Sequence, residues 1–261
     1  GTNHQYMLFF TQKGKCFWMR VYEIPEGSKN SKGRAIQNLI NIEQDDKVKA
    51  FICTQDLKDE DYVNNHYVIM ATKMGQVKKT SLEQYSRPRS NGINAITIKD
   101  EDELLEAKLT NGNSQIMLAV ESGKAIRFEE SKTRPMGRNA SGVRGIKLKD
   151  KKDQVVGMVS VNDMDANILV VSENGYGKRS DIDSYRITNR GGKGVKTISI
   201  TTKTGNLIAI KNVIDSDGLM IINKSGVMIR MNVEAMRVMG RATQGVKLIN
   251  LKESDQISSV A

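Results

Sequence analysis

Five segments of the chain share one order of apolar and polar positions. Each begins with an apolar run, continues through a polar turn that contains glycine, and is followed by basic residues in most cases. The segments cover residues 7–14, 68–75, 116–123, 168–175 and 219–226, so their turn glycines are separated by 61, 48, 52 and 51 residues. A period of about 50 residues with strand-like units indicates a propeller-type repeat array.

Each turn glycine is followed by a second glycine at a nearly constant distance of 19, 17, 19, 19 and 19 residues. The five pairs are Gly14/Gly33, Gly75/Gly92, Gly123/Gly142, Gly175/Gly194 and Gly226/Gly245. A strand-like stretch follows each second glycine, at residues 35–40, 93–98, 143–148, 195–200 and 246–251. A charged loop and another short apolar strand then close the unit.

These elements predict a four-stranded antiparallel blade in each unit. The first turn is expected to be a tight hairpin in which glycine adopts a positive φ. The apolar runs before it show little alternation, which is typical of strands buried on both faces. Single helical turns are expected at residues 80–85 and 232–237.

The sequence therefore predicts an all-β, propeller-like array of about five to six four-stranded antiparallel blades. We expect residues 1–261 to form one domain, with repeat units at about 7–55, 68–109, 116–160, 168–211 and 219–261.

The overall charge adds a prediction about partners. With 40 Lys and Arg against 30 Asp and Glu, the net charge is +10, which favours an acidic partner such as nucleic acid. A hydrophobic content of 38% is too high for a disordered chain. The sequence has no apolar run of membrane-spanning length and no recognisable signal sequence, and its 2 cysteines are too few for a disulfide framework. We expect a reduced cytoplasmic protein without membrane association.

The cations recur at fixed places in the repeat, which distinguishes them from a merely basic surface. Lys78, Lys79, Arg127, Lys178, Arg179 and Arg230 lie three or four residues after a hairpin glycine, where the first unit instead has Trp18. Lys29, Arg138, Arg190 and Arg241 lie four residues before a second glycine, and Arg87 and Arg89 lie near that place in the second unit. Lys32, Arg34, Arg144, Lys193, Lys196 and Lys247 lie beside a second glycine.

In a cyclic array, equivalent positions fall on one rim, so these cations predict a positive belt that binds nucleic acid. Acidic residues fall mostly in the loop that leaves each blade and predict a separate acidic surface. Solvated blade ends are the alternative interpretation of the same cations.

No catalytic or metal site is predicted. Residues 191–194 (Gly-Gly-Lys-Gly) resemble a phosphate-binding loop, but the lysine lacks the Ser or Thr that should follow it. His4 and His66 have no second metal-ligand candidate at a useful spacing. We expect no cofactor in this chain.

Several motifs resemble the C-terminal DNA-wrapping domain of bacterial DNA gyrase A. They include Gly-Lys-Ala-Ile-Arg-Phe at 123–128, the segment 134–148, Asn-Gly-Tyr-Gly-Lys-Arg at 174–179, and the segments 70–80 and 238–246. The resemblance covers essentially the whole chain. It implies a β-pinwheel, in which neighbouring blades exchange strands, that wraps double-stranded DNA with one hand around a basic perimeter.

The same resemblance implies a role in ATP-dependent negative supercoiling by the type IIA topoisomerase. The implied partners are the remainder of gyrase A and the whole of gyrase B, with ATP and Mg used elsewhere in the holoenzyme. The implied location is the cytoplasm, in association with the nucleoid.

Two departures keep alternatives open. The signature box of the family, Gln-Arg-Arg-Gly-Gly-Lys-Gly, normally lies in the first blade and would precede Gly1 here. A box-like loop that matches five of its seven positions lies instead in the fourth unit, at Arg190, Gly191, Gly192, Lys193 and Gly194. Five units and no leading box also fit the C-terminal domain of the corresponding topoisomerase IV protein, and a protein-binding propeller with an incidentally basic rim is a further alternative.

Overall fold

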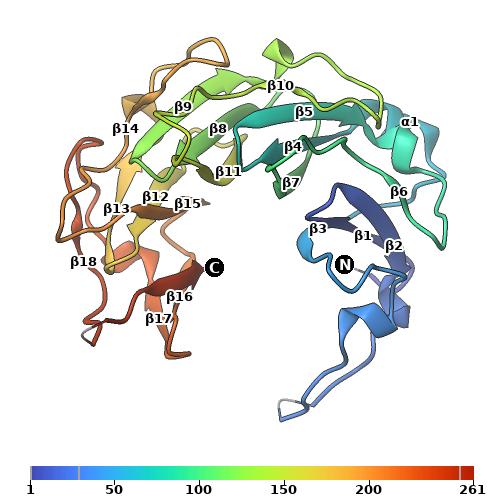
Figure 1. The fold of residues 1–261 in the computed structure, drawn as a ribbon, viewed down its shortest axis with the longest axis horizontal. Coiled ribbons are helices and arrows are strands. Elements are labelled where there is room, and N and C mark those ends of the chain that lie inside the picture. The colour runs from blue at the N-terminus through green and yellow to red at the C-terminus, as the bar shows by residue number, and fades with distance from the viewer. Residues whose placement is uncertain (1, 29, 253) are drawn as a thin grey trace. The chain divides into compact units, whose positions relative to one another are not determined.

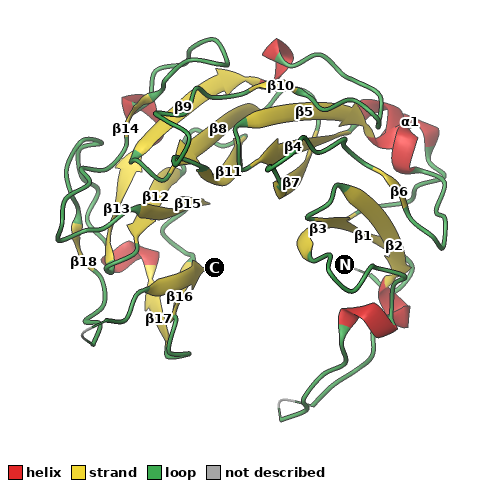
Figure 2. Ribbon diagram, in the orientation of Figure 1, coloured by secondary structure: helices red, strands yellow, loops and turns green. Residues whose placement is uncertain are grey.

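Strands form most of the regular structure in this computed structural model, which describes residues 2–28, 30–252 and 254–261 (Figure 2). The helices are short, and α1 (Glu60–Asn65) is the only α-helix of the described residues. None of the helices in these ranges is long and apolar enough to cross a membrane. The chain divides into two compact units, Gly1–Gly112 with Thr133–Val143, and Asn113–Lys132 with Arg144–Ala261. The predicted all-β class is confirmed.

The first unit carries two antiparallel sheets (Figure 1). The first sheet has the order β3-β1-β2-β6 and the second the order β10-β5-β4-β7. The strands are β1 (Tyr6–Thr11), β2 (Lys15–Arg20), β3 (Val48–Cys53), β4 (Tyr67–Thr72), β5 (Gln76–Ser81), β6 (Ile93–Asn94), β7 (Leu104–Thr110) and β10 (Val143–Arg144). The 3-10 turns are η1 (Val21–Glu23), η2 (Ile36–Asn38) and η3 (Leu82–Tyr85).

The second unit carries three sheets, with the orders β11-β8-β9-β14, β15-β12-β13-β18 and β17-β16-β19. Its first strands are β8 (Gln115–Val120), β9 (Lys124–Glu129), β11 (Val155–Val161), β12 (Asn167–Ser172), β13 (Tyr176–Asp181) and β14 (Val195–Lys196). The others are β15 (Leu207–Val213), β16 (Gly218–Asn223), β17 (Met228–Asn232), β18 (Val246–Lys247) and β19 (Ile257–Val260). Its 3-10 turns are η4 (Glu130–Lys132), η5 (Ile182–Ser184) and η6 (Val233–Ala235). The helical turns expected near residues 80–85 and 232–237 are thus confirmed by η3 and η6.

Adjacent blades exchange strands. The outermost strand of each four-stranded sheet belongs to the following repeat: β6 pairs with β2, β14 with β9, and β18 with β13. The fifth sheet has three strands in the described chain. Strand exchange of this kind defines a β-pinwheel. The prediction of four-stranded blades is correct for the first four sheets, but the fourth strand of each comes from the next repeat.

The strand expected after each second glycine is shorter than the sequence suggests. Only two residues pair as a strand, and the chain then bends toward the hairpin turn of the partner blade. The amides of Ala95 and Ile96 both donate to Gly14 O, at 2.8 and 3.1 Å, and Leu248 N donates to Gly175 O at 2.8 Å. These bonds replace a continued ladder.

In the first repeat the equivalent stretch, residues 35–40, forms the 3-10 turn η2 rather than a strand. Side chains three residues apart lie on one side of a 3-10 turn. Ile36 and Leu39 are therefore both able to pack against the apolar cluster that contains Phe9 and Phe17. The prediction of a strand at residues 35–40 was wrong because this packing decides the local conformation.

The two glycines of each repeat have a backbone that other residues rarely adopt. All five hairpin glycines have φ of 83–85°, and all five second glycines have φ of 67–85°. The predicted positive φ of the hairpin turns is confirmed. At Gly142 the neighbouring backbone is also close, since a Cβ there would lie 2.6 Å from Val77 O.

An aspartate in the charged loop fastens the hairpin turn in four of the five repeats. The residue before the hairpin glycine donates its amide to this carboxylate: Lys13 to Asp46 at 3.0 Å, Met74 to Asp102 at 2.9 Å, Ser122 to Asp153 at 3.0 Å, and Ser225 to Asp255 at 3.3 Å. These particular acidic residues therefore have a structural role in addition to their charge.

The apolar runs form strands that have a neighbour on each side within their sheets. In β4, Val68, Ile69, Met70 and Ala71 are all 0% exposed, which confirms burial on both faces for this run. The prediction is wrong for the fifth run, since β16 alternates and its Met220 is 37% exposed. The core of the first unit joins β1 and β4 side chains around Tyr85, whose ring meets Phe10 edge-on at 5.7 Å. In the second unit Tyr185 lies at the equivalent position in a separate core cluster.

Candidate nucleic-acid interface

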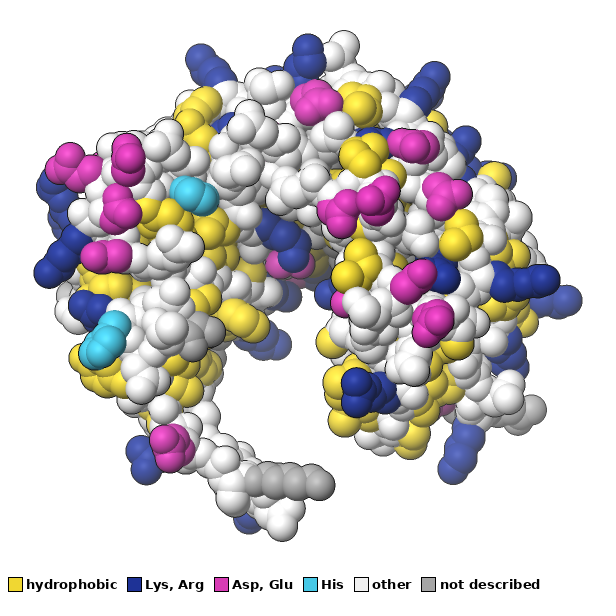
Figure 3. Space-filling view, turned by 180° about the vertical axis from the view of Figure 1, so that it is seen from behind, with side chains coloured by type: hydrophobic (Ala, Val, Ile, Leu, Met, Phe, Trp, Pro, Cys, Tyr) yellow, Lys and Arg dark blue, Asp and Glu magenta, His cyan; other side chains and the backbone are white. Residues whose placement is uncertain are grey.

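Twelve of the eighteen cations predicted to bind nucleic acid are exposed or half-exposed. Most of them lie in or beside the loop that ends at the second glycine. Figure 3 shows many Lys and Arg side chains projecting from the margins of the surface, with Asp and Glu side chains on the face toward the viewer. The twelve are Lys32, Arg34, Arg87, Arg89, Arg138, Arg144, Arg190, Lys193, Lys196, Arg230, Arg241 and Lys247. Lys29 lies outside the described residues.

The other five predicted cations are buried: Lys78, Lys79, Arg127, Lys178 and Arg179. All five lie three or four residues after a hairpin glycine, on β5, β9 or β13. Their surface position was expected because they recur, but what recurs at this place is a structural contact. We therefore leave them out of the candidate interface.

The residue four positions after the hairpin glycine bonds to the helical turn of the following repeat. Trp18 Nε1 donates to Tyr85 O at 2.9 Å, Arg127 Nη1 donates to Tyr185 O at 2.9 Å, and Arg179 Nε donates to Met236 O at 2.7 Å. The sequence signal for this structural contact was Trp18 at the same place in the first repeat. An uncharged indole cannot replace the charge of arginine, but it can replace its N–H donor. In the second repeat this place is held by Lys79, whose ammonium lies 4.1 Å from the centre of the Tyr67 ring.

The residue three positions after the hairpin glycine is a fully buried lysine in the second and fourth repeats. Lys78 Nζ donates to Ala95 O at 2.5 Å and to Arg138 O at 2.6 Å. Lys178 Nζ donates to Gly240 O at 2.5 Å and to Arg241 O. Burial, reinforced by the neighbouring guanidinium of Arg138 or Arg241, lowers the pKa of Lys78 to about 7 and that of Lys178 to about 8.

Three loops of the same length present six of the twelve exposed or half-exposed arginines of the described chain. They cover residues 134–142, 186–194 and 237–245, and we call them the arginine loops. Each begins with an exposed arginine, has a second arginine four residues before its final glycine, and leads directly into an exchanged strand. The first arginines, Arg134, Arg186 and Arg237, were missed from the sequence although each lies eight residues before a second glycine.

The arginine loops of the second unit are fastened to the preceding repeat by their own arginines. Arg190 Nη1 donates to Arg144 O at 3.1 Å, and Arg241 Nη1 donates to the equivalent carbonyl, Lys196 O, at 2.6 Å. Two backbone bonds, Gly191 N to Gly145 O at 2.6 Å and Lys147 N to Gly192 O at 2.8 Å, hold the box-like loop in the same way. The box-like loop therefore has the same structural place as the equivalent loops of other blades.

In the first unit, three arginines surround a surface hollow of about 310 Å³. Arg87 and Arg89 come from the loop after η3, and Arg138 comes from the arginine loop 134–142, where its amide donates to Gln84 Oε1 at 3.2 Å. Guanidinium groups bind phosphate through charge-assisted hydrogen bonds. The hollow is therefore a candidate phosphate-binding place.

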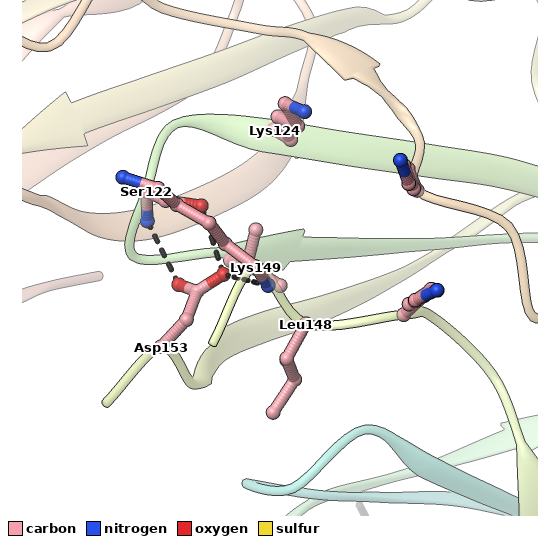
Figure 4. A pocket seen from close by; sticks show the side chains of 8 residues that line it. Ser122, Lys124, Leu148, Lys149 and Asp153 are labelled. Carbon is pink, nitrogen blue, oxygen red and sulfur yellow. Dashed lines mark hydrogen bonds between the residues drawn. The ribbon is translucent and has the colours of Figure 1, made fainter. Parts of the chain in front are cut away.

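In the second unit, four lysines line a pocket of about 260 Å³ (Figure 4). They are Lys124, Lys147, Lys149 and Lys193, of which only Lys193 was expected in the interface. Figure 4 shows the carboxylate of Asp153 turned toward Ser122 and the backbone of Lys149, and its oxygens accept bonds from Ser122 N, Ser122 Oγ and Lys149 N at 2.9–3.0 Å. With four lysines against one carboxylate, the lining of the pocket has a positive balance.

Among the described residues no group of three or more His, Cys, Asp or Glu side chains is placed to hold a metal ion. The functional groups that gather at the described hollow and pocket are the side chains of arginine and lysine. This arrangement can bind an extended polyanion through many separate contacts.

Strand-exchanged blades with arginine loops define a repeat domain of the β-pinwheel class. A family model for the DNA gyrase C-terminal domain, a β-propeller, matches residues 5–55, 66–111, 115–162, 166–213 and 219–261. The chain belongs to this family.

Similar proteins include DNA gyrase A of Staphylococcus epidermidis, 43% identical over 261 residues, and that of Staphylococcus aureus, 42% identical over 262 residues. Each alignment covers 100% of this chain and 29% of the relative, so the chain spans less than a third of those proteins. A crystal structure of the C-terminal domain of DNA topoisomerase IV has a TM-score of 0.88 at 25% identity, covering 99% of this chain and 79% of that one. A DNA gyrase A C-terminal domain has a TM-score of 0.84 at 24% identity, covering 100% of this chain and 83% of that one, and supports the fold.

Proposed function

We propose that this domain binds double-stranded DNA without sequence preference and wraps it with one hand. In the proposal, wrapping serves ATP-dependent negative supercoiling by DNA gyrase. The observation that carries the proposal is the recurrence of exposed arginines at the same places in three arginine loops, within a chain of the gyrase C-terminal family.

The chemistry of these side chains supports binding to the phosphate backbone. Arginine and lysine contacts to phosphate position a protein on DNA but carry no direct sequence information. Such contacts release counterions, so the affinity should fall steeply with salt. Twelve exposed or half-exposed predicted cations would give a slope of log K against log [salt] as steep as about −11 if every one met a phosphate.

The energy of wrapping is within reach of this number of contacts. Bending about 35 base pairs through roughly 180° costs on the order of 10 kcal/mol, extrapolated from elastic estimates for smaller bends. A single phosphate contact contributes about 1 kcal/mol, so ~10 contacts offset the bend. Arg134, Arg186 and Arg237 add further candidates to those expected from the sequence.

The catalytic steps of supercoiling would belong to other parts of the enzyme. The proposed partners are DNA, the remainder of gyrase A, and gyrase B. ATP and Mg would act outside this domain, which needs no cofactor of its own in this proposal, and the place of action would be the cytoplasmic nucleoid.

A topology assay tests the proposal directly. The 261-residue chain is bound to relaxed closed-circular DNA, the DNA is treated with a type I topoisomerase, the protein is removed, and the linking number is read on a gel. A positive shift that grows with protein concentration is the expected result. Absence of DNA binding at moderate salt would refute the proposal.

A second candidate function follows from the similarity to the topoisomerase IV domain. In this case the domain bends or tethers DNA, and the assay would show binding without a linking-number shift. A protein-binding domain would instead show an affinity for DNA that changes little with DNA length or salt.

A further inference from the structure

Lys78 and Lys178 are each 0% exposed, although an ammonium group is costly to remove from water. They occupy the same place in the second and fourth repeats, three residues after the hairpin glycine. The equivalent residues in the other three repeats are Phe17, Ile126 and Ile229. An apolar side chain is therefore compatible with this position, and packing alone does not require lysine.

The two lysines share a specific contact. Each donates a hydrogen bond to the backbone carbonyl of an arginine in the next repeat, Lys78 to Arg138 O at 2.6 Å and Lys178 to Arg241 O. Arg138 and Arg241 each lie four residues before the final glycine of their arginine loop. Both arginines are half-exposed members of the candidate interface.

Each lysine also holds a second carbonyl, so its ammonium is fixed from two sides. Lys78 donates to Ala95 O at 2.5 Å, which ties the arginine loop 134–142 of the third repeat to the exchanged segment of the second repeat. Lys178 donates to Gly240 O at 2.5 Å, next to Arg241 in the same loop. Because a neutral amine retains two N–H donors, both bonds persist whether or not the lysine is charged.

We propose that Lys78 and Lys178 are positioning residues for DNA binding, each fixing the backbone of an arginine loop so that its arginine faces phosphate. This inference rests on the proposed function. Fixing the carbonyl of Arg138 or Arg241 restricts the backbone torsion at the Cα that bears the side chain. It thereby lowers the conformational freedom that the arginine would otherwise lose on binding.

Trypsin offers a test that needs no DNA, because it cleaves after arginine at the carbonyl that each lysine holds. The variants are Lys78→Met and Lys178→Met in the 261-residue chain, with Ile126→Met as the matched control at the equivalent place. Lys78→Met should accelerate cleavage after Arg138 and leave cleavage after Arg241 at the wild-type rate. Lys178→Met should have the reverse effect, and Ile126→Met should change neither, as mapped by mass spectrometry.

DNA affinity provides the second readout, measured against salt on a duplex of fixed length. Each lysine variant should bind about 2- to 10-fold more weakly, and its salt slope should fall in magnitude by about 1, the loss of one phosphate contact. Lys78→Met should add little to Arg138→Gln in a double-mutant cycle, since both remove the same contact. A general loss of stability would not produce this pattern.

Loop-specific cleavage combined with the non-additive loss of affinity would support the proposal. Cleavage that stays at the wild-type rate, or that rises equally at both loops, would overturn it. Altered cleavage with wild-type affinity and slope would also overturn it, because the lysines would then be structural only. If the wild-type chain fails to bind DNA, the proposed function fails, and the cleavage pattern still shows separately whether the lysines hold the loops.

Discussion

Replacing Gly142 with alanine should destabilise the first unit for two separable reasons. The first is conformational, since Gly142 has φ of +85°, a region that costs other residues about 1–2 kcal/mol. The second is steric, since the new Cβ would lie 2.6 Å from Val77 O and 3.2 Å from Lys78 Cβ. Backbone shifts that relieve such overpacking typically cost about 1–3 kcal/mol.

Gly33 offers a matched control in the same unit. Its φ is +68°, but a Cβ there would meet nothing within 4 Å. Gly33→Ala should therefore lose only the conformational part, about 1–2 kcal/mol, whereas Gly142→Ala should lose about 2–5 kcal/mol in total. The difference between the variants isolates the close approach of the arginine loop to β5.

Urea unfolding followed by tryptophan fluorescence is a suitable measurement. Trp18 is the only tryptophan of the chain, and it lies on β2 of the first unit with its indole bonded to Tyr85 O. The fluorescence transition therefore reports on the unit that contains both glycines. Equal destabilisation by the two substitutions would refute the argument that the arginine loop packs directly on the β5 backbone.

Two further predictions concern charge. The double variant Arg87→Gln/Arg89→Gln should lower the magnitude of the salt slope for DNA binding by about 2, whereas Lys151→Gln/Lys152→Gln in the charged loop should leave it unchanged; equal effects in a salt titration would argue against a localised interface. The pKa of Lys78 is lowered to about 7 by burial and by Arg138, so the unfolded chain retains a proton between about pH 7 and 10.5 that the folded chain has lost. The free energy of unfolding, relative to Lys78→Met, should therefore stay constant below pH 7 and rise by a few kcal/mol as the pH approaches 10.5, and a flat difference in urea unfolding at pH 6–10 would contradict the cause assigned to the pKa.

The sequence by itself determined the repeat and its turns. The apolar runs had little polar alternation, and strands such as β4 are buried on both faces as a result. The paired glycines marked ten positions of positive φ, because only glycine adopts this backbone without strain. These features depend on residues close in the chain, which is why a single sequence was sufficient to predict them.

Only the tertiary structure decided which cations face solvent. Arg179 and Arg230 have the same place after the hairpin glycine, yet Arg179 is buried and Arg230 is exposed. The difference lies in what covers each strand: β13 is flanked by the exchanged strand β18 and its loop, whereas β17 is an edge strand of the three-stranded sheet in the described chain. Strand exchange joins residues about 60 positions apart, such as Lys178 and Arg241. Position in the repeat is local information, but burial depends on these distant segments. The sequence therefore located the cations, and only the fold showed which of them are buried and which are exposed.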